Sequence, residues 1–128
     1  MSTSINAQWI LRIATAGTFI GHGVFALEAK KSWFVYFSSF GITDEKTITT
    51  LLLLIGIADL LLAIHILVRP VRALVLWMAF WGLWTALVRW PFGPDPLWDF
   101  VERWANWGSP LSLLLLMGWP RKSGEWWK

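Results

Sequence analysis

The sequence contains no cysteine among its 128 residues. This absence excludes disulfides, thiolate metal sites and cysteine nucleophiles, and it carries no information on the redox compartment. Charged residues are also scarce, at 15% of the chain, whereas soluble domains usually contain about a quarter. The sequence further lacks a glycine-rich phosphate loop, a serine-nucleophile motif and a metal-binding spacing of histidines and acids. An enzyme that acts on its own is therefore not favoured, and we expect no catalytic or metal site.

Apolar residues and tryptophan, in contrast, are abundant. Apolar residues make up 56% of the chain, and twelve residues are tryptophan. Tryptophan favours the membrane–water boundary, where its ring lies in apolar surroundings while its N–H stays hydrated. The composition therefore predicts a small polytopic membrane protein with a single domain. The formal charge of +3 comes from scattered basic residues, which suits loops beside anionic lipid and does not indicate nucleic-acid binding.

Four apolar stretches are close to the roughly 20 residues that cross a bilayer as a helix. We therefore expect an all-α protein with four transmembrane helices in an antiparallel bundle, at residues 9–28, 48–68, 71–90 and 98–119. The last stretch is either one helix kinked at Pro110, or a short surface helix followed by a span from about residue 106 to 119. In the first span, Gly17 and Gly21 form a small-xxx-small pair, which predicts close approach by another helix.

The segment KKSWFVYFSSFG follows the first span and is too short to cross a membrane. Its aromatic residues are of the kind that gather at the membrane boundary. The segment therefore predicts an interfacial or re-entrant element after the first helix.

Asp59 is the only acid in the middle of an apolar stretch, whereas Glu28, Asp99 and Glu102 lie near the ends of theirs. A carboxylate at bilayer depth costs roughly 2.5–3.5 kcal/mol on insertion scales, so it normally faces a partner, water or the protein interior. Helix rise places His22 within about 6 Å of Asp59 along the membrane normal. It also places Arg12 at about the same depth as His65. These four residues predict a polar intramembrane site for a quinone headgroup or a proton; the alternative is a His22–Asp59 hydrogen bond that only fixes helix packing.

Trp77, Trp81 and Trp84 recur at helical spacing in the third span. They form either a ridge that faces lipid or a neighbouring helix, or an aromatic wall for a flat hydrophobic ligand such as a quinone or pigment. His22 and His65 fall in opposite halves of the bilayer, roughly 15 Å apart along the normal, which argues against a haem held by both histidines. A single axial bond from either histidine to a haem or a chlorophyll stays open.

The motif LRIATAGTFIGHG in the first span, together with Gly56 and Asp59 in the second, resembles the DoxX-like family of small four-helix membrane proteins. The detailed match covers Arg12, Phe19, Gly23 and Asp59. The resemblance implies a link to quinone-dependent redox chemistry, because the family looks like the small subunit of a thiosulfate:quinone oxidoreductase. The segment RWPFGPDPLWDFVERWANWGSPL has no counterpart in the family motif.

These patterns favour a non-catalytic accessory or structural subunit of a larger membrane complex, of a redox or electron-transfer kind. Its partners are then lipid and either other membrane subunits or further copies of itself. The alternative is a quinone-linked oxidoreductase subunit with its site at His22 and Asp59; a small transporter is less favoured because no internal repeat is visible. Six basic residues on the side of the termini against five on the other side favour cytoplasmic termini, in a bacterial inner membrane.

Overall fold

The structure is a computed structural model that describes residues 2–128, and these residues form helices and connecting segments with no strand. The long helices are α1 (Thr3–Leu27), α3 (Glu45–Val68), α4 (Arg72–Leu87) and α7 (Trp104–Met117). The short ones are η1 (Lys31–Trp33), α2 (Phe34–Ser38), α5 (Arg89–Phe92), α6 (Pro96–Val101) and η2 (Ser123–Trp127). Three stretches are long and apolar enough to cross a membrane, namely Thr3–Leu27, Glu45–Val68 and Arg72–Phe92. The prediction of an all-α fold is confirmed, and these helices are consistent with an integral membrane protein.

Residues 98–119 form two helices rather than one. α6 ends at Val101, the backbone at Arg103 leaves helical geometry (φ −97°, ψ 10°), and α7 starts at Trp104. The Arg103 guanidinium donates to Asp99 O at 2.8 Å and to the Glu102 carboxylate at 2.5 Å, which holds the turn together. Pro110 lies inside α7 without ending it. Of the two arrangements that the sequence allowed, a short helix followed by a separate last helix is therefore the one observed.

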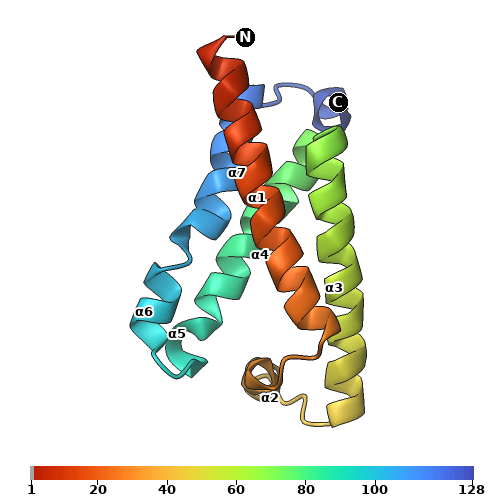
Figure 1. Ribbon diagram of the computed structural model, residues 1–128, viewed down its shortest axis with the longest axis vertical. Helices are drawn as coiled ribbons and strands as arrows, with labels where there is room; N and C mark the ends of the chain where they lie inside the picture. Colours follow the sequence, from red (N-terminus) through yellow and green to blue (C-terminus); the bar gives the residue numbers. More distant parts are fainter. Residues whose placement is uncertain (1) are drawn as a thin grey trace.

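The long helices pack in a fixed order around the molecule. α1 packs along α3 and α7, and α4 packs on α7. Both termini lie at the same end of the molecule (Figure 1). α3 and α4 are consecutive but contact each other little, and they diverge from the turn that joins them (Figure 1). α2 lies at the far end from the termini, between the end of α1 and the start of α3 (Figure 1).

The buried apolar side chains form two clusters. The larger one joins α1, α3, α4 and α7, and includes Phe19, Ile66 and Met78. The smaller one centres on Ala26 and Leu52, and the aromatic side chains of η1 and α2 pack against it. The segment that was predicted to be interfacial is therefore partly drawn into the protein interior.

The closest approach of α1 to α3 lies at Gly23 and Gly56. A β-carbon on Gly56 would stand 2.9 Å from Gly23 O, and one on Gly23 would stand 3.2 Å from Gly56 O. A β-carbon at Gly17 or Gly21 would meet nothing within 4 Å. No helix among residues 2–128 therefore covers Gly17 and Gly21, because small-xxx-small spacing marks a face of one helix without identifying what covers it.

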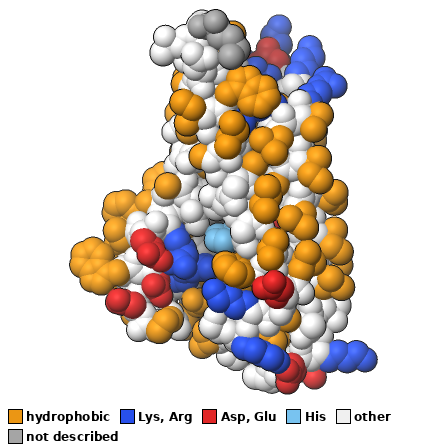
Figure 2. All heavy atoms as spheres, viewed as in Figure 1, with side chains coloured by type: hydrophobic (Ala, Val, Ile, Leu, Met, Phe, Trp, Pro, Cys, Tyr) orange, Lys and Arg blue, Asp and Glu red, His pale blue; other side chains and the backbone are white. Residues whose placement is uncertain are grey.

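Charged side chains gather towards the two ends of the molecule, with apolar side chains between them (Figure 2). At the end far from the termini, Asp44 caps α3 by accepting hydrogen bonds from Thr47 N at 2.9 Å and Thr47 Oγ1 at 2.6 Å. These hydrogen bonds, chiefly the one from the Thr47 hydroxyl, lower the pKa of Asp44 below its ordinary value, because they stabilise the ionised carboxylate. An ion pair between Lys31 and Glu45 ties the aromatic segment to the same helix start.

Candidate functional site

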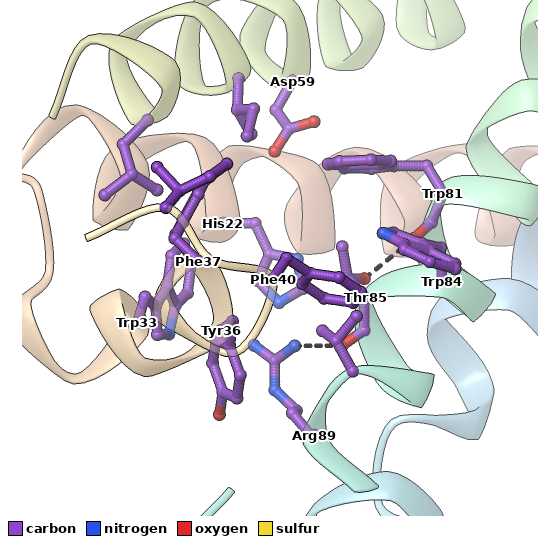
Figure 3. Close-up of a pocket in the computed structure, with 14 residues that line it drawn as sticks. His22, Trp33, Tyr36, Phe37, Phe40, Asp59, Trp81, Trp84, Thr85 and Arg89 are labelled. Carbon is purple, nitrogen blue, oxygen red and sulfur yellow. Dashed lines mark hydrogen bonds between the residues drawn. The ribbon is translucent and has the colours of Figure 1, made fainter. Parts of the chain in front are cut away.

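A half-open cavity of about 220 Å³, here called the pocket, lies where α3 and α4 diverge (Figure 3). Side chains from α1, η1, α2, α3, α4 and α5 line it. Five of the lining side chains are polar, namely His22, Tyr36, Asp59, Thr85 and Arg89. The remaining lining residues are apolar and mostly aromatic. The pocket therefore joins segments that are far apart in the sequence around a few polar groups.

Aromatic rings form much of the wall of the pocket. Trp81 and Trp84 come from α4, and further rings come from the segment after α1, at Trp33, Phe37 and Phe40 (Figure 3). Trp77 does not line the pocket; its ring stacks on that of Trp81 at a centroid distance of 5.9 Å and an angle of 17°. Of the three tryptophans proposed as an aromatic wall, two therefore face the pocket and the third supports one of them from behind.

Asp59 reaches the pocket because of its register on α3. The buried residues of α3 recur at a spacing of three or four, and they are Ile48, Leu52, Gly56, Asp59, Ala63 and Ile66. Asp59 thus takes a position that is otherwise apolar, and only 3% of its surface is exposed. Its carboxyl points towards the pocket (Figure 3). Within residues 2–128 no hydrogen bond or ion pair to this carboxyl is formed.

His22 enters the same pocket from α1. Its ring meets Trp33 edge to face, with 5.9 Å between centroids. The structure therefore brings His22 and Asp59 to one cavity, as their depth in the membrane predicted. No hydrogen bond joins the two side chains among the residues described, so the alternative of a bonded pair that fixes helix packing is not observed.

Three polar residues of the pocket were not singled out by the sequence analysis, namely Tyr36, Thr85 and Arg89. Arg89 is the charged one among them. It is 4% exposed, and its guanidinium donates to Thr85 O. The guanidinium also lies 5.3 Å from the Tyr36 ring centre and 5.8 Å from that of Trp33. No carboxylate lies within ion-pair distance among residues 2–128. The sequence did hold a signal, because Arg89 follows Trp81 and Thr85 at four-residue steps and so shares their helix face.

Arg12, which was grouped with the polar site, lies outside the pocket and binds the end of α3. Its guanidinium donates to the last carbonyls of this helix, at Ile66 (2.7 Å), Leu67 and Val68 (3.4 Å). It also stacks on the Trp9 ring, 3.9 Å from its centre. A cation at a helix C-terminus meets both free carbonyls and the negative end of the helix dipole. Arg12 therefore serves as a cross-helix cap.

His65 lies near Arg12 at the same end of α3 but bonds to a different group. Its Nε2 accepts a hydrogen bond from Val71 N at 2.9 Å, across the turn that joins α3 to α4. No hydrogen bond joins His65 to Arg12 among the residues described. Arg12 and His65 thus lie at the same end of α3 but bond to different groups, and neither residue lines the pocket.

Replacing Arg12 should loosen the end of α3. We expect Arg12→Gln to lower the free energy of unfolding by about 1.5–3 kcal/mol, because the charged hydrogen bonds to three carbonyls are lost together. Arg69→Gln provides the control, since Arg69 is exposed and its side chain makes no hydrogen bond among residues 2–128. Thermal stability of the two variants in mild detergent measures the difference. Equal melting temperatures for both would contradict the capping role.

The arrangement of charge in the pocket suits a small ring with polar atoms on two sides. Asp59 and Arg89 lie on opposite sides of the cavity, with His22, Phe40 and Thr85 between them (Figure 3). An ionised carboxylate only accepts hydrogen bonds, and a guanidinium only donates them. Within residues 2–128, no group of three or more histidine, aspartate or glutamate side chains is placed to hold a metal ion.

Comparison of the chain with protein-family models, with curated proteins and with solved structures gives no match. The resemblance to the DoxX-like family therefore has no support from these comparisons.

Proposed function

We propose that the protein is an integral membrane subunit that binds the headgroup of a quinone in the pocket and serves a larger redox complex. One observation carries this proposal: a single cavity combines flat aromatic walls with a carboxyl and a guanidinium on opposite sides (Figure 3). Ligand pockets usually pair such an apolar lining with a few well-placed polar groups. The DoxX-like resemblance points in the same direction.

The size of the pocket supports a ligand with one ring. Its volume of about 220 Å³ is below the roughly 300–1,000 Å³ of sites that enclose whole drug-sized molecules. A single quinone ring fits the volume of this pocket, while its isoprenoid tail remains in the lipid. A haem or a chlorophyll carries a macrocycle of four pyrrole-type rings, which is much larger than one quinone ring, so the volume argues against both, including attachment through His22.

Hydrogen bonding also supports a quinone. The ring carries two oxygens on opposite sides, and the pocket presents polar groups on opposite sides at Asp59 and Arg89 (Figure 3). Trp81 and Trp84 offer faces for stacking against the ring. Arg89 donates to one ring oxygen through its free N–H groups, and the Asp59 carboxyl bonds to the other when either it or that oxygen carries a proton.

The accessory role follows from what the chain offers for electron transfer. A quinone exchanges electrons with a redox centre, and this chain has no cysteine to hold an iron–sulfur cluster. We propose that a partner subunit carries the redox centre, while this chain supplies the quinone site. The large apolar side chains exposed along α1, α3 and α4, such as Ile10, Leu54 and Phe80, meet lipid or this partner.

The membrane arrangement proposed here has four crossings. α7 has 14 residues and reaches about 21 Å, so it completes the fourth crossing together with α6 and the adjoining interfacial tryptophans. The end that holds the termini carries six basic residues against five at the other end, and this excess supports termini in the cytoplasm of a bacterium.

Direct binding tests the proposal. Protein in phosphatidylcholine nanodiscs is dialysed to equilibrium against a benzoquinone with a decyl tail, and empty nanodiscs measure simple partition into lipid. We expect saturable binding above the partition level, with about one quinone per chain. Thr85→Trp should abolish it by filling the pocket. The same substitution at Thr50, which is exposed and does not line the pocket, leaves binding unchanged. Binding no greater than in empty nanodiscs would overturn the proposal.

A further inference from the structure

We propose that the pocket distinguishes the reduced from the oxidised form of its ligand through Asp59, and that it prefers the reduced, hydroxyl-bearing form. The inference rests on the proposed quinone function. It is drawn from the hydrogen-bonding roles of the two charged side chains that face the pocket, of which, among residues 2–128, Asp59 has no hydrogen-bond partner and Arg89 has no carboxylate partner.

The Arg89 side of the pocket has one fixed role. A guanidinium carries five N–H donors and accepts no hydrogen bond. One of these donors bonds to Thr85 O, and no carboxylate is within ion-pair distance among the residues described. The side chain is otherwise buried, so the remaining donors are directed to what fills the pocket. The ligand atom on this side must therefore be an acceptor, and either a quinone carbonyl or a quinol hydroxyl oxygen meets that need.

The Asp59 side has a role that depends on the proton of its carboxyl. The ionised carboxylate only accepts, whereas the protonated acid also donates. A quinol hydroxyl donates to the carboxylate or accepts from the acid, so it is bound in both states. A quinone carbonyl only accepts, so it meets a repulsive pair of oxygens unless Asp59 is protonated. Buried acceptors that face each other without a hydrogen are costly.

Other groups at the pocket leave this asymmetry in place. Arg89 lies on the opposite side of the cavity from Asp59, and no ion pair joins the two among the residues described (Figure 3). His22 and Tyr36 also line the cavity, and both carry a donor and an acceptor, so neither discriminates between the two forms of the ligand. We therefore assign the discrimination to Asp59, the one acidic side chain among the described residues that line the pocket.

The test compares two forms of one ligand in two variants. The probes are the decyl-tailed benzoquinone and its chemically reduced quinol, dialysed without oxygen at pH 8 against protein in phosphatidylcholine nanodiscs. In the natural protein we expect a Kd for the quinol about 10-fold below that for the quinone, the value of one buried hydrogen bond. In Asp59→Asn the ratio should fall to about one, because an amide donates as well as accepts. Asp59→Glu should keep the preference.

Each outcome bears on a different claim. Asp44→Asn makes the same acid-to-amide change outside the pocket, and it should leave the ratio as in the natural protein. Saturable binding of both forms with equal Kd in the natural protein, or with the same ratio in Asp59→Asn, would overturn the inference and leave the quinone site standing. Binding of neither form above empty nanodiscs would overturn the proposed function and this inference with it.

Discussion

Gly82→Ala should prevent α4 from packing on α7 and cost more than about 3 kcal/mol of stability. A β-carbon on Gly82 would stand 2.3 Å from Asn106 O and 2.7 Å from Asn106 C, both backbone atoms. The two helices would have to separate by roughly 1 Å to reach the 3.4 Å of ordinary contact. The Asn106 carbonyl has no hydrogen bond within α7, because the residue four positions later is Pro110, which has no N–H to donate.

The same substitution at Gly17 is the control for this prediction. A β-carbon there meets nothing within 4 Å, and alanine favours a helix over glycine by up to about 1 kcal/mol. Gly17→Ala should therefore hold or raise the melting temperature in detergent, while Gly82→Ala yields little folded protein. If both variants melt like the natural protein, the close contact between Gly82 and Asn106 does not exist in solution.

The sequence predicted the helices well, because their signals are local. Apolar runs near the length of a bilayer core marked three of the helices, and an aspartate within such a run marked a position that must turn inward. Helix rise alone was enough to give Asp59 and His22 similar depths, and both line the pocket. These inferences need only the geometry of single helices.

The parts that were missed depend on how helices meet. Gly17 and Gly23 both lie on α1, and nothing in their spacing says that Gly56 approaches the second and not the first. Arg12 sits near a helix end, where reaching lipid headgroups and capping the end of α3 look the same in sequence. The packing of the other helices decides whether an arginine binds backbone carbonyls, as Arg12 does, or faces a cavity, as Arg89 does.

Arg89 was missed for a related reason. The sequence predicts a third span over residues 71–90, and an arginine at the end of such a span is ordinary. In the structure Trp90 and Pro91 leave helical geometry, and the segment after α1 folds over Arg89 with Tyr36 and Trp33. A residue that would reach water at the end of a straight helix is thereby buried beside a cavity.

Arg89→Met should weaken quinone binding about 10- to 100-fold and yet leave the empty protein as stable as before, or more stable. The loss in binding reflects one hydrogen bond from a charged donor, worth roughly 1.5–3 kcal/mol. The gain in stability follows because methionine is of similar length and carries no charge to bury. What the empty protein loses is one bond to Thr85 O and contact with two aromatic rings.

This opposite response of binding and stability separates a ligand-binding arginine from a structural one. Arg12 donates to three backbone carbonyls, so its loss should destabilise the protein. Arg103→Met is the closest control, because Arg103 pairs with Glu102 and Asp99 O and does not line the pocket. It should lower the melting temperature and leave the quinone Kd unchanged. If Arg89→Met instead lowers the melting temperature and leaves the Kd unchanged, Arg89 holds the fold together and the quinone oxygen lies elsewhere.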